Sequence, residues 1–127
     1  MINLKKIFLF RYPSLAKKAH FNEEQGILTI EILFKNPRYS VWLKQENKGC
    51  IVGINFLHNH FDLESEEENL ENMFSYFEEI VNDKIVAIGN KKNNENYIIA
   101  TLDRDLGISK YLNMPNIEIC SFNENIK

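Results

Sequence analysis

The sequence contains no complete catalytic signature, and it is poor in the residues that usually build one. It has five glycines, all isolated, and none belongs to a G-x-S-x-G, G-x-G-x-x-G or phosphate-loop pattern. The common templates for hydrolases, dinucleotide-binding enzymes and phosphate-binding enzymes are therefore excluded.

Cysteines and long apolar runs are also scarce. Cys50 and Cys120 lie far apart, outside any C-x-x-C pair, in apolar strand-like runs. This pattern predicts buried free thiols, with a disulfide or reactive thiol as the alternative, and it is typical of a reducing compartment. No apolar run approaches bilayer length, and the run Ile7–Phe10 ends at Arg11, too soon for the apolar core of a signal peptide. We therefore expect a cytoplasmic protein with no membrane association.

Basic residues are missing from one whole segment. Residues 61–83 hold nine acidic residues and no lysine or arginine, whereas residues 1–60 hold nine basic residues against four acidic ones. Residues 84–127 hold six basic and five acidic residues, so the formal net charge of −3 hides a strong asymmetry. Such an asymmetry informs about binding partners more than about the fold.

What is present fits a single domain over residues 1–127, of which 44% are hydrophobic. The predicted strands are 27–35, 39–45, 50–56, 84–89, 97–102 and 117–122, and the predicted helices are 13–21, 66–81 and a short one within 105–113. Residues 3–11 fit either a helix or a strand, and residues 22–26 fit a polar break. The expected fold class is α+β, a mostly antiparallel sheet of five to six strands in the order α-βββ-α-ββ-(α)-β, with helices packed on one face.

The helix at 66–81 is the clearest element. Ser65 and Glu68 form an S-x-x-E capping box, which predicts that two backbone donors at the helix start are satisfied. Leu70, Phe74 and Phe77 belong to an apolar stripe at helical spacing. Most glutamates then face solvent without a local counter-charge: Glu64, Glu66, Glu67, Glu68, Glu71, Glu78 and Glu79.

Two interpretations of this acidic face stay open. It is either an ordinary solvated helix surface or a surface that binds a basic partner. Exposed helices usually interleave both signs, because opposite charges four residues apart stabilise a helix and like charges destabilise it. The missing lysines favour a basic protein partner and disfavour nucleic acid.

The histidines that precede this helix admit three interpretations. An HNH nuclease spreads its motif over tens of residues, whereas here the three letters are consecutive, so that interpretation is rejected. In an extended strand, His58, His60 and Asp62 would share one side and could ligate zinc or non-haem iron. We favour a structural role, in which His58, His60 and Ser65 shape a strand-to-helix turn, and we expect no metal and no other cofactor.

Residues 39–88 resemble immunity proteins of bacterial polymorphic-toxin and contact-dependent growth-inhibition systems. The likeness is carried by Trp42, the H-x-H-F-D run from His58 to Asp62, the acidic helix with Phe74 and Phe77, and the run Asp83–Ala87. The resemblance implies a cytoplasmic protein that does no chemistry and that neutralises the C-terminal domain of a cognate toxin by binding it. Nuclease toxins are commonly basic, because they bind phosphates.

The resulting hypothesis is an immunity protein, a monomer or weak homodimer, that binds a basic nuclease domain. The residues expected to bind the toxin are Trp42, Tyr39, Asp62 and the seven glutamates named above, with one aromatic residue as the central anchor. Trp42 alternatively lies in the core or on a sheet face. Two further hypotheses stay open: a small metal-dependent enzyme that uses His58, His60 and Asp62, and a non-enzymatic scaffold or regulator whose strand edge, with 97–102 as the candidate, pairs with another chain.

Overall fold

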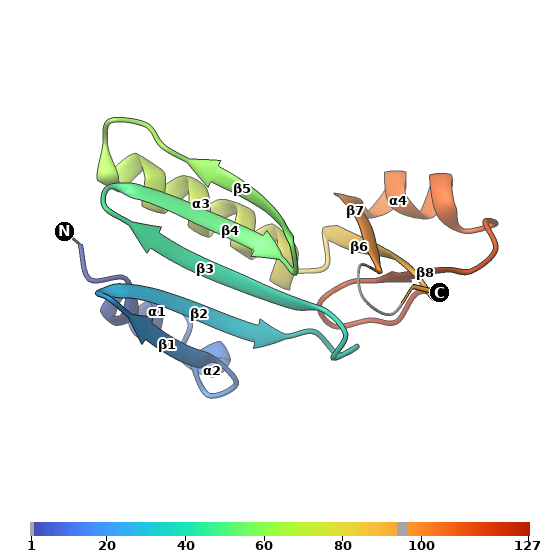
Figure 1. Ribbon diagram of the computed structural model, residues 1–127, viewed down its shortest axis with the longest axis horizontal. Coiled ribbons are helices and arrows are strands. Elements are labelled where there is room, and N and C mark those ends of the chain that lie inside the picture. Colours follow the sequence, from blue (N-terminus) through green and yellow to red (C-terminus); the bar gives the residue numbers. More distant parts are fainter. Residues whose placement is uncertain (1, 94–96) are drawn as a thin grey trace.

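The computed structural model describes residues 2–93 and 97–127, and it has an α+β fold (Figure 1). The described helices are α1 Leu4–Arg11, α2 Pro13–Ala16, α3 Glu66–Val81 and α4 Arg104–Tyr111. The strands are β1 His20–Glu24, β2 Ile27–Leu33, β3 Ser40–Glu46, β4 Gly49–Ile54, β5 Leu57–Phe61, β6 Ile85–Asn90, β7 Ile98–Asp103 and β8 Ile117–Cys120. The predicted fold class is confirmed, but the strands form two antiparallel sheets where one was expected.

The first sheet is a meander in the order β1-β2-β3-β4-β5. Two-residue turns join β1 to β2, β3 to β4, and β4 to β5. Each turn contains a residue with φ between 52° and 54°, namely Gln25, Asn47 or Asn55. Asparagine tolerates this left-handed backbone better than most residues, which is why short hairpins favour it.

Alternation along the strands gives the first sheet two different faces. Ile30, Leu43 and Val52 lie side by side across β2, β3 and β4 and are buried under the helices. The intervening residues form the outer face, which no helix covers in the described chain. In Figure 1 this outer face lies toward the viewer, with α1 and α3 behind the sheet.

Helix α3 forms and packs as predicted, with one difference at its start. Ser65 is the N-cap and accepts a hydrogen bond from the backbone N–H of Glu68 at 3.2 Å. The reciprocal bond of a complete capping box, from the Ser65 N–H to the Glu68 carboxylate, does not occur among the described residues. The helix packs mainly on β4 and also contacts β3 and β5. Its buried side is made by Asn69, Leu70, Met73, Phe74, Phe77 and Ile80.

The N-terminal region differs most from expectation. The segment 3–11 forms helix α1, Leu4–Arg11, and Asn3 caps it by accepting a hydrogen bond from the Lys6 N–H. The helix predicted at 13–21 ends at Ala16, and the predicted polar break is replaced by β1. Phe8 fixes α1 to the core through an edge-on contact with Phe77, with ring centroids 5.7 Å apart.

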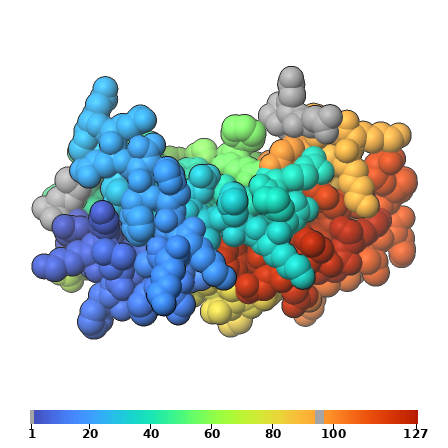
Figure 2. All heavy atoms as spheres, turned by 90° about the horizontal axis from the view of Figure 1, so that it is seen from below, coloured from blue at the N-terminus to red at the C-terminus, as the bar shows by residue number. Residues whose placement is uncertain are grey.

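The second sheet has the order β7-β6-β8 and packs against α4. The main core continues into it, because buried Ile85, Cys120 and Phe122 belong to the same apolar cluster as the first sheet. Part of the predicted loop between β6 and β7, residues 94–96, lies outside the described residues. Figure 2 shows the N-terminal segment (blue) and the C-terminal segment (orange to red) at opposite ends of the molecule. No described helix has the length and apolar character needed to cross a membrane.

Candidate interaction surfaces

Three of the predicted partner-binding glutamates are engaged within the protein. The Arg11 guanidinium binds the Glu71 carboxylate at 3.1 Å. The Tyr12 hydroxyl donates to Glu78 at 2.7 Å, and burial together with this bond raises the pKa of Tyr12. Glu66 accepts hydrogen bonds from the Ile2 N–H at 2.6 Å and from the side chain of Gln45 at 3.0 Å. Of these three glutamates, only Glu71 meets a counter-charge, and Arg11 supplies it from a distant segment of the sequence; Glu66 and Glu78 have uncharged hydrogen-bond partners.

The other four glutamates are exposed and unengaged. Glu64, Glu67, Glu68 and Glu79 make no hydrogen bond or ion pair through their carboxylates with any residue in 2–93 or 97–127. Arg11 and Tyr12 engage Glu71 and Glu78, whereas Glu68 and Glu79 stay exposed; Glu68 lies three residues from Glu71 and therefore on a neighbouring part of the helix surface. The unengaged part of α3 is therefore smaller than predicted, and Glu79 shares the lining of a surface hollow with Lys84 and Arg104.

Trp42 lies on the outer face of the first sheet, on the opposite side from α3. Its indole N–H donates to the Asn55 carbonyl at 2.7 Å, and its ring covers Gly53 on the neighbouring strand. A Cβ at Gly53 would collide with the indole ring, so glycine is required for this close approach. Trp42 is half-buried. The expected grouping of this aromatic anchor with the glutamates of α3 is wrong, because the sheet separates them.

Tyr39 is fully buried and does not reach a surface. Its hydroxyl donates to Glu118 at 2.7 Å, and its ring packs edge-on against Tyr97 with the centroids 5.2 Å apart. Burial and the Glu118 carboxylate raise the pKa of Tyr39. Tyr39 thus joins the two sheets, and its predicted role as a partner-binding anchor is wrong for this conformation.

His58 and His60 lie within β5, so their predicted role in a turn is wrong. Both point to the outer face with their ring centroids 4.8 Å apart, and Asp62 follows on the same face over Gly49. The three side chains form a row and do not converge. Among the described residues, no group of three or more His, Cys, Asp or Glu side chains is placed to hold a metal ion.

A groove on the outer face was not predicted from the sequence. Its volume is about 360 Å³, and Leu33, Trp42, Phe56 and Tyr97 contribute to its lining. Phe56 is 69% exposed and Leu33 is 57% exposed, which is unusual for large apolar side chains next to each other. The sequence signal was Asn55, which marks the β4–β5 turn and thereby places Phe56 at its tip.

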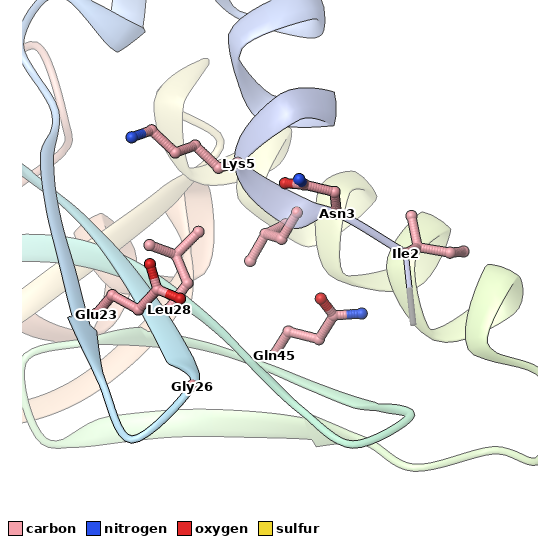
Figure 3. Close-up of a pocket in the computed structure, with 8 residues that line it drawn as sticks. Ile2, Asn3, Lys5, Glu23, Gly26, Leu28 and Gln45 are labelled. Carbon is pink, nitrogen blue, oxygen red and sulfur yellow. The ribbon is translucent and has the colours of Figure 1, made fainter.

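A second cavity, of about 310 Å³, lies between α1 and the β1–β2 hairpin (Figure 3). Figure 3 shows Lys5 on the helix wall, with Glu23 and Gln45 on the opposite side. The Lys5 ammonium lies 5.2 Å from the Phe21 ring, and the Gln45 amide is held by Glu66. These side chains stabilise the junction between α1 and the sheet, and they do not pair a nucleophile with a base.

No protein-family model, no curated protein and no solved structure matches the chain. The surfaces described above therefore carry the functional argument by themselves.

Proposed function

We propose that this protein is an immunity protein, which binds and neutralises a cationic toxin domain without catalysing a reaction. The observation that supports this most is the set of unengaged carboxylates of Glu67, Glu68 and Glu79 on α3, with that of Glu64 just before the helix. The resemblance of residues 39–88 to immunity proteins favours the same function.

The helix that presents these carboxylates is anchored before any partner arrives. Its opposite side is buried in the core, so little conformational entropy is lost when the acidic side is covered. Each uncompensated like-charge pair on a helix costs roughly 0.2–0.5 kcal/mol. A basic partner would remove this cost and would gain from the long-range field.

The charge distribution also favours one class of target. A nuclease domain carries a basic surface for phosphate, and that surface is complementary to an acidic helix. Electrostatic steering of this kind can raise association rates by about 10- to 1,000-fold at low salt. An inhibitor that acts this way covers the substrate site and requires no catalytic residue of its own.

Co-expression tests the proposal directly. The C-terminal domain encoded by the neighbouring gene is expressed with and without this protein, and growth and co-purification are measured. We expect growth arrest with the domain alone, rescue by this protein, and a stable complex. If the neighbouring domain is harmless, or if no complex is recovered from cells that are rescued, the proposal is wrong.

A matched pair of variants tests the role of the acidic helix. Glu67→Gln with Glu68→Gln removes two unengaged charges from α3, whereas Glu23→Gln with Glu24→Gln removes two exposed charges from β1. We expect the first pair to slow association with the toxin domain about tenfold at low salt, with a smaller effect at high salt. Equal rates for both variants would remove α3 from the interface.

A further inference from the structure

The groove on the outer face of the first sheet presents apolar surface that is held in place. Phe56, at the β4–β5 turn, and Leu33, on β2, are both exposed there. The indole of Trp42 is fixed at its N–H by the Asn55 carbonyl and on one side by Gly53. Trp42 is only half-buried and lines the groove, so part of its ring stays open to a ligand.

The positive charge that lines this groove is already engaged. The Arg38 guanidinium binds the Glu118 carboxylate at 3.0 Å and donates to the Asn93 carbonyl at 3.4 Å. Its flat side lies over the Tyr97 ring, 4.2 Å from the centroid. The Asn55 side chain, which also lines the groove, donates to the Arg38 carbonyl and to the Tyr97 hydroxyl. Because Glu118 neutralises Arg38 and Tyr97 covers one side of it, Arg38 is a poor receptor for an anionic ligand.

One carboxylate in the groove has no cation paired with it in the described part of the chain. Glu31 is exposed on β2 and lies opposite Trp42 on β3. Its Oε2 accepts a hydrogen bond from the Ser40 hydroxyl at 2.8 Å, which orients the carboxylate. No lysine, arginine or histidine within 2–93 or 97–127 forms an ion pair with it. The groove thus combines an open aromatic surface with one uncompensated negative charge.

The basic side chains at neighbouring positions of the same face do not supply the missing charge. His20 is the residue opposite Glu31 on β1, and no ion pair joins these two described side chains. Lys44, two positions after Trp42 on β3, is paired with Glu46 at 2.6 Å. A cation from outside the chain can therefore reach Glu31 without displacing an internal ion pair.

We propose that this groove binds an arginine side chain that a partner protein presents. A guanidinium matches both features of the groove, since its plane stacks on aromatic rings and its N–H groups bind a carboxylate in parallel. Trp42 and Phe56 would contact the plane and the alkyl stem, and Glu31 would accept the hydrogen bonds. Helix α3 lies on the other side of the sheet, so the inference goes beyond the proposed function and does not depend on it.

Other occupants fit the groove less well. Arg38 shows that the groove accommodates a guanidinium, because its own guanidinium combines the Tyr97 ring with the Glu118 carboxylate. An anionic ligand would be repelled by Glu31. A wholly apolar segment would bury the charge of Glu31 without a partner, which is unfavourable.

Two short peptides test the site in the full-length protein. The probe is acetyl-Gly-Arg-Gly-amide, and the control peptide replaces arginine with citrulline, which has nearly the same shape and no charge. Chemical shifts of the isotope-labelled protein are followed by NMR at constant ionic strength, and the single indole N–H signal reports on Trp42. With the arginine peptide we expect saturable shifts at Trp42, Ser40 and Phe56 and a dissociation constant of about 1–10 mM. The citrulline peptide should bind about tenfold more weakly.

Two matched pairs of variants separate the charge contribution from the aromatic contribution. Glu31→Gln removes the charge but keeps an acceptor for Ser40, and it should weaken binding about tenfold. Its control, Glu24→Gln, removes an exposed charge from β1 and should change nothing. Phe56→Ala should weaken binding about fivefold. Its control, Phe10→Ala, removes a ring that is 87% exposed on α1 and should leave binding unchanged. Circular dichroism and thermal unfolding establish that each variant is folded.

The outcomes decide the inference separately from the proposed function. Saturable shifts at the groove that both Glu31→Gln and Phe56→Ala weaken support the site. Equal binding of the two peptides, shifts confined to the glutamates of α3, or no shift up to about 50 mM peptide would each overturn it. So would shifts of the groove signals that depend on protein concentration alone, because a second copy of the chain would then occupy the groove. Co-expression with the neighbouring toxin domain is measured separately, so neither result decides the other.

Discussion

Asn69 should be the most sensitive polar residue of α3. Its side chain is fully buried and makes three hydrogen bonds of 2.8 Å: it accepts from the Leu63 N–H and donates to the carbonyls of Leu63 and Lys48. The carboxamide therefore ties the β3–β4 turn and the β5–α3 connection to the helix. Asn69→Ala leaves all three backbone groups without their partner.

The magnitude follows from these three bonds. Each contributes about 1 kcal/mol net, and unpaired buried groups cost at least that much, so the loss is about 3 kcal/mol. Alanine recovers roughly 0.5 kcal/mol through its higher helix propensity. The expected decrease in the free energy of unfolding is thus about 2.5 kcal/mol, which for a chain of this length lowers the melting temperature by about 9 °C.

Denaturant and thermal unfolding measure this difference, and two further variants act as controls. Asn72→Ala makes the same substitution one turn later at an exposed position and should leave stability unchanged or slightly higher. Asn69→Asp keeps the acceptor for Leu63 but turns a carboxylate oxygen toward two carbonyls, so it should be no more stable than the alanine variant. If Asn69→Ala lies within about 0.5 kcal/mol of the unmodified protein, the buried network does not hold these segments together.

Gly53 and the two buried cysteines give two further predictions. Gly53→Ala should destabilise the protein by about 1–3 kcal/mol, because the new methyl group collides with the indole ring of Trp42. The substitution should also shift the fluorescence emission of Trp42, the single tryptophan. Unchanged emission and stability would refute the close contact. Burial raises the pKa of Cys50 to about 11 and of Cys120 to about 12, so iodoacetamide at pH 8 should label both thiols only after unfolding. Since free thiols titrate near pH 9, the stability that these groups contribute should be lost as pH rises from about 9 through 11 to 12, and rapid labelling of the folded protein would contradict their burial.

The sequence predicts the elements that combine a clear period with a clear boundary. Helix α3 is correct over its whole length, because Ser65 caps it and its apolar residues repeat at helical spacing. Strands β2, β3 and β4 are predicted to within two residues at each end, because alternating apolar residues are interrupted by turn residues such as Asn47; the strand predicted at 50–56 includes the turn residues Asn55 and Phe56. Local sequence and tertiary packing favour the same conformation in these segments, so propensity and pattern are sufficient.

Edge strands are harder to predict from the sequence, because they need not bury a continuous apolar face. The sequence of β1, HFNEE, has no alternation that distinguishes it from a loop. In β5 the alternation of Leu57, Asn59 and Phe61 is weakened by the polar middle residue, and the turn before it has Phe56 where glycine is usual. The division into two sheets is also invisible in the sequence, since it depends on contacts such as Tyr39 with Glu118 between distant residues.

The acidic surface could be predicted from amino-acid composition only in part. Composition correctly identifies α3 as a helix without basic residues. Which carboxylates stay free depends on Arg11 in α1 and Tyr12 at its C-cap, which the fold places next to α3. The sheet likewise separates Trp42 from the glutamates that were expected to surround it. The ring of His58 lies 5.8 Å from that of Trp42, so the aromatic surface on the outer face and the free carboxylates of α3 lie on opposite sides of the first sheet.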